Sequence, residues 1–464
     1  MDKKEEMNLI SQVLSSFKVG HGEISVTTGP SVALYEFEPM IGVRMSKIRN
    51  LKDEFAAALK TSGVRVIAPM PGKGTVGIEV PNRERQIVPI EDMLSCDRYI
   101  NTKMQLPLAI GKTVEGNDFV VDLAEMPHLL VAGATGQGKS VGLNVILASL
   151  LRKKSPDELK LVLVDPKQVE LSVYEKITKP YLAHLNGQPA ICTDAETAQD
   201  TLSAILELME KRYAMLKEAG ARNISEYNAA KKDKMPYYVV VIDEYGDLIM
   251  TAEDEMEHII CRLAQKARAV GIHLIISTQR PDITVVTGNI KANFPTRIAF
   301  RTTTGTDSRV ILDRNGAERL TGKGDMLFFS GAETTRVQCA YISTDEVSEM
   351  CAELEQKYAD CKETLLDGTR LPLSEEDIEF AVFANMRSQH RPFKDLLNTA
   401  LALTDYYHVG DKERQELAEK HIILHPCDIM QLSLYKIIDR QCREFNVLVH
   451  DKEKIKRIIE WWSK

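Results

Sequence analysis

The sequence lacks several features that mark specialised classes of protein. No apolar run approaches the roughly 18 residues that a membrane-spanning helix requires. The first residues, MDKKEEMNLI, are charged and do not contain the apolar core of a secretory signal. Glycine (26) and proline (18) are too few for a low-complexity or fibrous chain of 464 residues. We therefore expect a globular, cytoplasmic protein with no membrane span.

Paired cysteines and excess positive charge are also missing. The eight cysteines are scattered, without a C-x-x-C pair or a matching histidine spacing. This pattern favours buried, reduced thiols over disulfides or a structural zinc site. The formal net charge is −8, so any nucleic-acid contact must come from a local basic surface.

The pattern of the chain changes twice, and its length is consistent with about three domains. Residues 1–95 combine a helical stretch over 45–59 with short strands such as VRVIAPM and VGIEV, which predicts a small α/β domain. Residues 96–345 alternate apolar runs (HLLVAG, LKLVLVD, YYVVVID, GIHLIIST and TRIAFRT) with amphipathic helices. That alternation predicts a mostly parallel sheet joined by right-handed crossovers. Residues 346–464 predict a mainly helical region of unknown role.

Two helices can be predicted in more detail. Thr193 and Glu196 have the spacing of a capping box, an apolar stripe follows over 198–216, and Gly220 terminates the helix. The final segment, EKIKRIIEWWSK, has an apolar face that predicts packing on the body of the protein or on a partner. That face consists of Ile455, Ile458, Ile459 and Trp462.

The strongest motif is GATGQGKS, which matches the phosphate-binding pattern G-x-x-x-x-G-K-[ST]. The strand HLLVA precedes it and the helical run VGLNVILASLL follows, as a P-loop requires. Glycines let successive backbone N–H groups face phosphate oxygens, and the helix N-terminus adds partial positive charge. Lys139 then neutralises the β- and γ-phosphates of ATP, and the Ser140 hydroxyl binds Mg²⁺. The predicted loop is Gly133, Ala134, Thr135, Gly136, Gln137, Gly138, Lys139 and Ser140.

An acidic pair follows a buried strand in YYVVVIDEYGDL. The carboxyl ends of strands are where open α/β sheets bind their ligands, so Asp243 and Glu244 are expected beside the P-loop. Asp243 is predicted to hold Mg²⁺, and Glu244 to polarise the attacking water, which favours hydrolysis. The next strand ends in Thr278 and Gln279, where Gln279 either contacts the γ-phosphate or is an ordinary strand-end amide.

Seven stretches of the sequence resemble the motor domain of FtsK/SpoIIIE double-stranded DNA translocases. They span about residues 96–345, in the family's order: HLLVAGATGQGKSVGLN, LVDPKQVELSVYE, YYVVVIDEYGDLIM, LAQKARAVGIHLIISTQRPD, IKANFPTRIAF, DSRVILD and GKGDML. GPSVALYEFEP, VRVIAPMPGK and VGIEVPN are similar to the family's α subdomain. The resemblance implies a hexameric ring of RecA-like ATPases, each a P-loop NTPase, around double-stranded DNA.

The resemblance also implies roles for individual basic residues. Arg268 matches the finger that reaches the γ-phosphate of a neighbouring subunit, although its position alone fits a solvated arginine; Arg297 is a second candidate. Arg280, Lys291 and Arg309 fall in the DNA-facing loops and are expected to contact phosphates, with solvated surface charge as the alternative. Gly305 replaces a basic residue that relatives often carry.

The sequence also departs from the family at both ends. The membrane-spanning region of division-linked relatives is not recognisable, and 370–464 has no recognisable winged-helix signature. The sequence therefore does not support directional loading at polar chromosomal sequences.

The predicted function is ATP-dependent translocation of double-stranded DNA. Two other classes share part of this pattern. A related ring ATPase could energise conjugative DNA transfer or protein secretion, and a DNA-binding scaffold could use ATP only for assembly. The acidic Glu244 argues against the scaffold.

Overall fold

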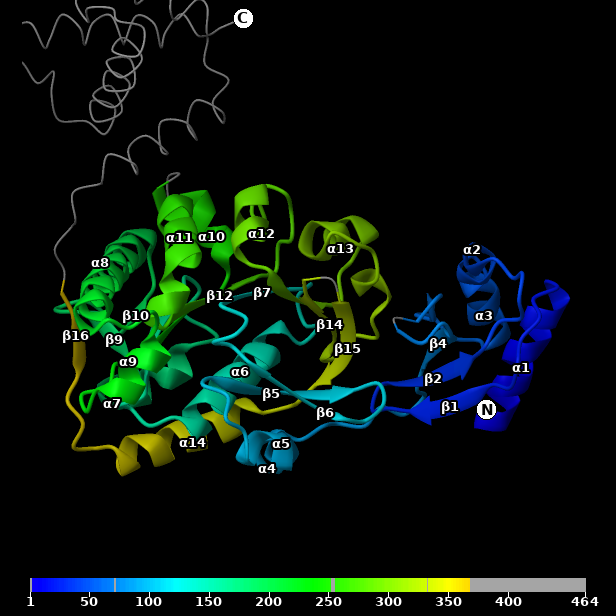
Figure 1. Ribbon diagram of the computed structural model, residues 1–464, viewed down its shortest axis with the longest axis horizontal. Coiled ribbons are helices and arrows are strands. Elements are labelled where there is room, and N and C mark those ends of the chain that lie inside the picture. Colours follow the sequence, from blue (N-terminus) through cyan, green and yellow to red (C-terminus); the bar gives the residue numbers. More distant parts are fainter. Residues whose placement is uncertain (1, 71, 252–254, 332, 368–464) are drawn as a thin grey trace, which may run out of the picture. The chain divides into compact units, whose positions relative to one another are not determined.

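A computed structural model describes residues 2–70, 72–251, 255–331 and 333–367 (Figure 1). Residues 1–251 and 259–369 belong to one compact unit. The apolar face expected over 455–462, and most of the helical region expected after 346, lie outside the described residues. Within the described ranges, no helix is long and apolar enough to cross a membrane. The six cysteines of these ranges form no disulfide bond with one another.

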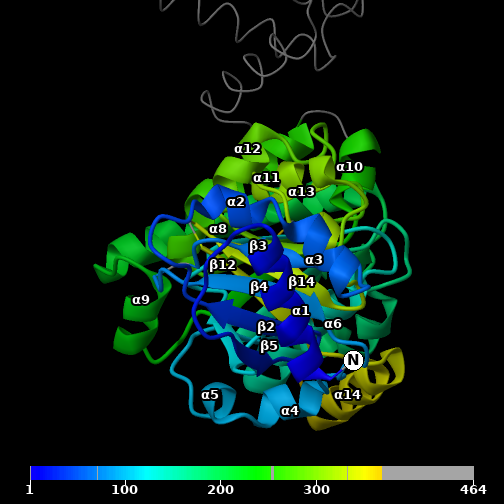
Figure 2. The same cartoon turned by 90° about the vertical axis from the view of Figure 1, so that its right-hand side faces the viewer.

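The N-terminal residues form a small antiparallel sheet with helices packed on it, as the sequence predicts for an α/β domain (Figure 2). Ile10 and Leu14 of the first helix are fully buried against Tyr35 and Phe55. The helix expected over 45–59 is instead two short helices, separated at Asn50 and Leu51. The sheet order is β1 (Ser25–Thr28), β2 (Val32–Phe37), β4 (Val76–Pro81) and β3 (Arg65–Ile67), and the helices are α1 (Lys3–Ser16), α2 (Met45–Arg49) and α3 (Lys52–Ala58).

The following residues form a ten-stranded sheet whose first six strands, in spatial order, are parallel. The five apolar runs of the sequence supply five of these strands, which confirms the mostly parallel sheet. The remaining four strands extend the sheet in antiparallel fashion. In order, the strands are β10 (Ile191–Cys192), β8 (Leu159–Val164), β11 (Tyr237–Ile242), β12 (Ile272–Thr278), β7 (His128–Ala132), β13 (Thr296–Phe300), β14 (Asp325–Ser330), β15 (Glu333–Cys339), β5 (Pro107–Thr113) and β6 (Asp118–Asp122).

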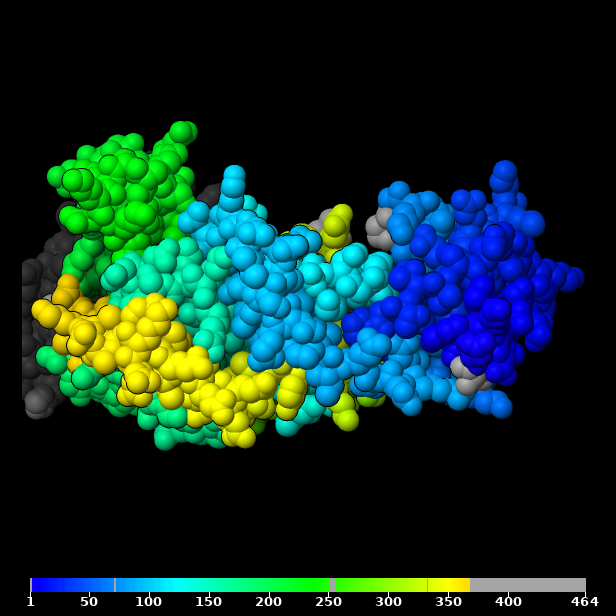
Figure 3. Space-filling view, turned by 90° about the horizontal axis from the view of Figure 1, so that it is seen from below, coloured from blue at the N-terminus to red at the C-terminus, as the bar shows by residue number. Residues whose placement is uncertain are grey.

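Helices cover both faces of this sheet. Figure 1 shows α6 (Lys139–Lys153) and α14 (Thr344–Lys357) on one face, with α8 (Ala195–Ala219) and α12 (Gly288–Asn293) on the other. Seen from below, α14 forms part of the outer surface (Figure 3). The other helices are α4 (Ile90–Ser95), α5 (Asp97–Ile100), α7 (Thr178–Tyr181), α9 (Ile224–Ala230), α10 (Tyr245–Thr251), α11 (Glu255–Lys266) and α13 (Gly305–Leu312), with 3-10 turns η1 (Ser172–Ile177), η2 (Ala267–Val270) and η3 (Ala317–Arg319).

Several helix ends can be compared with the sequence prediction. Helix α8 ends at Gly220, which has a left-handed φ of 66°, as predicted. Its N-cap is Asp194 rather than Thr193, because the Asp194 carboxylate accepts the Thr197 N–H at 2.8 Å. The predicted capping box at Thr193 is therefore wrong by one residue.

The expected domain boundaries fall next to packed helices. Helix α4, just before residue 96, contacts strand β5 of the large sheet. Helix α14 runs across residue 345 and contacts α6 and η1. Beyond it, β16 (Thr364–Leu366) pairs in parallel with β9 (Ala183–Leu185). The division at 95 and 345 stays a prediction.

Candidate nucleotide site

The glycine-rich loop lies between β7 and α6, at the carboxyl edge of the parallel strands. Gly136 and Gly138 have backbone φ angles of 74° and 115°, which residues other than glycine rarely adopt. At Gly138, an added Cβ would lie 2.7 Å from the backbone nitrogen of Gly324. The loop therefore needs glycine here both for its curl and for the close approach of a second loop. Helix α6 begins immediately afterwards, with its first N–H groups facing the loop.

Lys139 is buried at the start of α6, and its ammonium contacts the strands beside β7. Its Nζ donates to Asp243 Oδ1 at 2.5 Å and to Ser277 Oγ at 3.1 Å. This contact forms because β12 lies between β7 and β11, so three strand ends meet at one edge. Asp243, the first residue of the predicted acidic pair, thus contacts Lys139, and Glu244 follows it in the chain.

Asp243 follows β11 and is fully buried. Its Oδ1 also accepts the Ser277 hydroxyl at 2.7 Å, whereas its Oδ2 has no hydrogen-bond partner among the described residues. No group of three or more His, Cys, Asp or Glu residues in the described ranges is arranged to hold a metal ion. Mg²⁺ in nucleotide sites needs only one or two protein oxygens, with phosphates and water supplying the rest. The open oxygen of Asp243 fits that kind of site.

Ser140 lies beside a loop that the sequence analysis did not connect with the site. The Ser140 hydroxyl donates to Glu170, which follows β8 in the stretch DPKQVE. Asp165 organises this loop: it is fully buried, and its carboxylate accepts the backbone N–H groups of residues 167 through 171 at 2.9–3.1 Å. The available signal was that DPKQVE follows another parallel strand, whose carboxyl end must reach the same edge.

Glu244 is also fully buried, and its φ is +50°. A positive φ is unusual for glutamate and marks a backbone that its surroundings constrain. The Glu244 Oε1 accepts the Thr278 hydroxyl at 2.8 Å, and both carboxylate oxygens accept the Gln279 N–H at 3.1 Å. Lys167 donates to Oε2 at 3.4 Å. Lys167 is thus a second site residue that the sequence analysis missed.

Gln279 connects this carboxylate to the P-loop. Its side-chain oxygen accepts the Thr135 hydroxyl at 2.6 Å, while its backbone N–H contacts Glu244. The residue at the end of β12 therefore lies between the glycine-rich loop and the carboxylate. Its position fits a group that responds to the phosphates.

A cavity of about 380 Å³ opens beside the P-loop. Residues 85–88 and 338–341 line it together with Lys323 and the loop from 134 to 141. Ile87 and Tyr341 keep 71% and 48% of their surface exposed, although both are large and apolar. Such a cavity has the character of a nucleoside pocket. Sequence patterns did not indicate it, because its walls come from segments about 250 residues apart.

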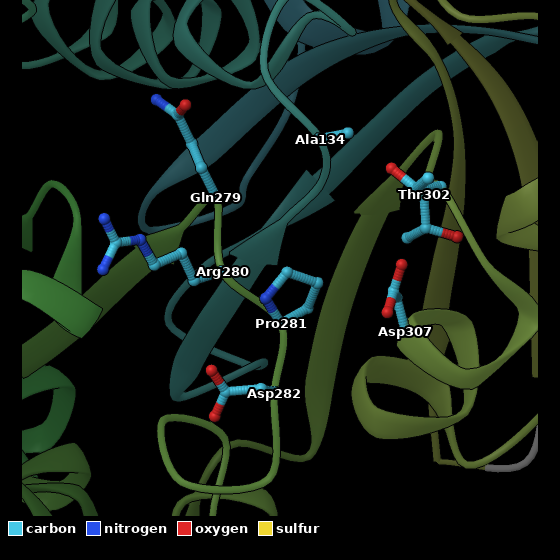
Figure 4. Close-up of a pocket in the computed structure, with 8 residues that line it drawn as sticks. Ala134, Gln279, Arg280, Pro281, Asp282, Thr302 and Asp307 are labelled. Carbon is cyan, nitrogen blue, oxygen red and sulfur yellow. The ribbon is translucent and has the colours of Figure 1, made fainter.

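A smaller cavity of about 170 Å³ lies between residues 279–282 and the stretch that includes Thr302 and Asp307 (Figure 4). Thr302 and Asp307 face Pro281 across this cavity, whereas the Arg280 side chain points away from it (Figure 4). Arg280 is 56% exposed and lies 3.8 Å from Asp247. It is therefore accessible at the carboxyl edge of the sheet.

The other predicted basic residues lie elsewhere. Lys291 of α12 pairs with Asp313 at 2.7 Å, and Arg309 of α13 contacts Thr306 and Asn315, so both lie on neighbouring helices. Arg268 lies exposed in η2, before β12 begins. The P-loop and acidic pair lie at the other end of β12, about 20 Å away for a seven-residue strand.

Arg297 is not available for a contact with another subunit. Its guanidinium is buried and donates to the backbone oxygens of Phe294, Ile311 and Lys291. It also pairs with Asp313 at 2.6 Å. Arg297 therefore anchors α12 and α13 to β13, and the prediction of a contact with a neighbour is wrong for this residue.

Comparisons with known proteins bear on these observations. The chain matches the FtsK/SpoIIIE family over residues 90–235 and 228–283, and the FtsK alpha domain over residues 1–82. It is 47% identical over 350 residues to the DNA translocase FtsK of Chlorobaculum tepidum. The aligned region covers 74% of this chain and 44% of that protein. It is 42% identical over 421 residues to the DNA translocase SftA of Bacillus subtilis, with 87% and 44% covered.

The chain belongs to the FtsK/SpoIIIE family. It spans about half the length of the curated relatives it matches. Among solved structures, it is similar to the pCW3 conjugation coupling protein TcpA with ATPγS (TM-score 0.52, 26% identity, 75% of this chain and 99% of that one). It also resembles the type VII secretion ATPase EccC of Thermomonospora curvata (TM-score 0.50, 22% identity, 63% and 37% covered). The fold is that of RecA-like P-loop ATPases, as predicted, and membership of this family implies nucleotide binding.

Proposed function

We propose that this chain is the motor of an ATP-dependent double-stranded DNA translocase. The observation that carries the proposal is the meeting of Lys139, Asp243 and Glu244 at one sheet edge, next to a cavity of nucleotide size. The names of the relatives, DNA translocases FtsK and SftA, support duplex DNA as the substrate.

The residues needed for ATP hydrolysis are gathered at this site. The N–H groups of the glycine-rich loop bind the phosphates, and Lys139 exchanges its contact with Asp243 for the β- and γ-phosphates. Asp243 and the Ser140 hydroxyl would hold Mg²⁺, which would neutralise phosphate charge. Glu244 orients the attacking water and accepts its proton.

The position of Arg268 supports a hexameric ring. Arg268 lies before β12, at the end of that strand opposite the P-loop of its own subunit, and we propose that it serves the site of a neighbour. Identical head-to-tail contacts of this kind close into a ring when the rotation between subunits allows it. The arginine then stabilises transition-state charge only in the assembled ring.

Duplex DNA passes through the ring along its basic loops. Arg280, Lys291 and Arg309 contact phosphates there. Phosphate contacts supply affinity without reading sequence, so the ring can step along any duplex. The acidic net charge of the chain restricts this contact to a local surface.

A second candidate function is DNA transfer in conjugation. The similarity to the coupling protein TcpA covers 99% of that chain and supports this alternative. Both functions use the same nucleotide chemistry, so the form of the DNA separates them. Translocation predicts stimulation of ATPase by double strands and not by single strands.

Triplex displacement on linear duplex DNA tests the proposal. The wild type with ATP should strip a third strand from the duplex, whereas Glu244→Gln should bind ATP without displacing it, because the water lacks its base. Lys139→Ala should fail to bind nucleotide. Normal ATP turnover by Lys139→Ala would show that the site is misassigned, and wild type that hydrolyses ATP without displacing the strand would exclude translocation.

A further inference from the structure

Four side chains of alternating charge connect the water-activating carboxylate with the exposed edge of the sheet. Glu244 Oε2 lies 3.4 Å from Lys167 Nζ, which lies 3.2 Å from Asp247 Oδ2. Asp247 Oδ1 is 3.8 Å from Arg280 Nη1. Glu244 is fully buried, Lys167 is 40% exposed and Arg280 is 56% exposed. The row therefore runs from the interior to the surface on which DNA is proposed to bind.

The Glu244 carboxylate is occupied in this arrangement. The Thr278 hydroxyl, the Gln279 N–H and the Lys167 ammonium all donate to its two oxygens. A carboxylate has about four lone-pair sites, so few remain for a water molecule. Glu244 is thus restrained where Lys167 holds it.

Lys167 and Asp247 each have two partners of opposite charge. Lys167 contacts both Glu244 and Asp247, and Asp247 contacts both Lys167 and Arg280. A phosphate that attracts Arg280 leaves Asp247 with one cation fewer, so Asp247 attracts Lys167 more strongly. Lys167 then loosens its contact with Glu244. The competition requires only side-chain movements at a half-exposed site.

We propose that Lys167 is a positioning residue that restrains Glu244 in the absence of DNA, and that Asp247 withdraws it when Arg280 engages a DNA phosphate. The proposal rests on the proposed function, in which Arg280 contacts duplex DNA. It explains how DNA binding accelerates ATP hydrolysis without touching the nucleotide. A ligand shifts such an equilibrium only by its differential affinity for the two states, and Arg280 supplies that difference.

Two substitutions in the full chain test this with opposite effects on the DNA-free rate. Lys167→Met removes the restraint and should raise DNA-free ATP turnover about twofold to fivefold, the range for one half-exposed ion pair. Asp247→Asn leaves Glu244 as the stronger partner of Lys167, so DNA-free turnover should stay at or below wild type. Both variants should lose most of the stimulation by duplex DNA, with little change in the KM for ATP.

Matched variants make the result specific. Lys167→Arg should restore much of the stimulation, and Lys217→Met, on the exposed surface of α8, should behave as wild type. DNA affinity of Lys167→Met, measured by fluorescence anisotropy on a labelled duplex, should stay near that of wild type. Far-UV circular dichroism should show that both test variants keep their helix content.

The opposing results are equally clear. If Lys167→Met lowers the DNA-free and DNA-saturated rates by one factor, Lys167 assists the chemistry directly and the restraint is wrong. If Asp247→Asn raises DNA-free turnover as Lys167→Met does, the competition between them is wrong. A wild type that DNA does not stimulate would overturn the proposed function. If duplex DNA stimulates ATP turnover equally in the wild type and in both variants, only this inference is overturned.

Discussion

At the scale of single residues, Asp165 is a carboxylate that shapes the site without taking part in its chemistry. Its two oxygens accept five backbone N–H groups and thereby fix the loop that carries Lys167 and Glu170. Without these acceptors, the buried Leu171 N–H is left unpaired at a cost of about 1–3 kcal/mol, and the four part-buried N–H groups lose the partner that orders them. The geometry of the loop therefore depends on this one side chain.

We expect Asp165→Ala to reduce kcat for ATP about tenfold or more, because Glu170 loses its position beside Ser140 in the P-loop. The free energy of unfolding should fall by about 2–4 kcal/mol, as for a broken buried network. Steady-state ATPase assays and urea denaturation measure the two effects. Asp157→Ala, in an exposed position on the preceding turn, is the control. Unchanged turnover in Asp165→Ala would show that the loop does not support the site.

Residues that belong to a local motif were predictable from the sequence, and residues that approach the site through folding were not. Asp243 directly follows a strand, and Lys139 follows the glycine-rich loop after another strand, so their side of the sheet could be deduced. Lys167 and Glu170 depend on the loop that Asp165 folds, which no spacing rule describes. Arg297 was misjudged because a sequence does not show whether an arginine donates to backbone carbonyls elsewhere in the chain.

At the scale of helices and strands, the pattern of apolar residues predicted the parallel strands reliably, whereas capping residues predicted the helix ends less reliably. The buried runs of β7, β8, β11, β12 and β13 were predictable because parallel strands covered on both faces are uniformly apolar. The antiparallel extension from β14 to β6 was not predicted, because partner choice depends on contacts far apart in sequence. The N-cap of α8 is Asp194, one residue after the predicted Thr193, because the Asp194 carboxylate accepts the Thr197 N–H.

Two buried histidines, the first residue of β7 and the second residue of β12, should influence stability through their titration. His128 accepts the Leu274 N–H on Nδ1 at 3.0 Å, which requires the neutral ring. Burial lowers the pKa of His128 to about 3, with His273 and Arg268 nearby adding to the effect, and burial lowers the pKa of His273 to about 4. The unfolded chain has a histidine pKa near 6.5, so it binds more protons below that pH.

Stability should therefore fall as the pH drops from about 6.5 to about 4, by about 1.4 kcal/mol per pH unit for each histidine. Urea denaturation at several pH values measures the slope. His128→Asn keeps an acceptor for the Leu274 N–H but does not titrate, so its slope should be shallower by about that amount. Equal slopes in the wild type and His128→Asn would contradict the assignment.

At the scale of the molecule, a buried arginine joins the small sheet to the large one. Arg336 of β15 pairs with Asp325 of β14 and with Glu79 of β4, both at 2.6 Å. Although burial opposes ionisation, Arg336 holds the pKa of Asp325 below its usual range. The turn before Asp325 also reaches the P-loop, where the Gly324 N–H donates to the Gln137 carbonyl at 3.0 Å. The N-terminal sheet is thus linked to the nucleotide site through one short turn.

The ring makes a prediction that a single subunit cannot test. Arg268→Ala should lower ATP turnover about 10³-fold or more, because the transition state loses a positive charge that a neighbour supplies. Lys139→Ala should be inactive for a different reason, since it does not bind the phosphates. Arg268→Ala nevertheless keeps an intact P-loop, and Lys139→Ala keeps an intact arginine finger. Arg222→Ala, which removes another exposed arginine (side chain 88% exposed), should keep normal turnover.

Mixing the two inactive proteins separates action on a neighbour from action within one subunit. In a random one-to-one ring, about a quarter of the interfaces join an intact P-loop to an intact arginine, so about a quarter of the activity should return. Each partner assayed alone with DNA should remain inactive. No recovery on mixing, in rings whose size is verified by sedimentation, would mean that Arg268 acts within its own subunit or only in folding. Recovery would require that the finger and the P-loop it serves belong to different chains.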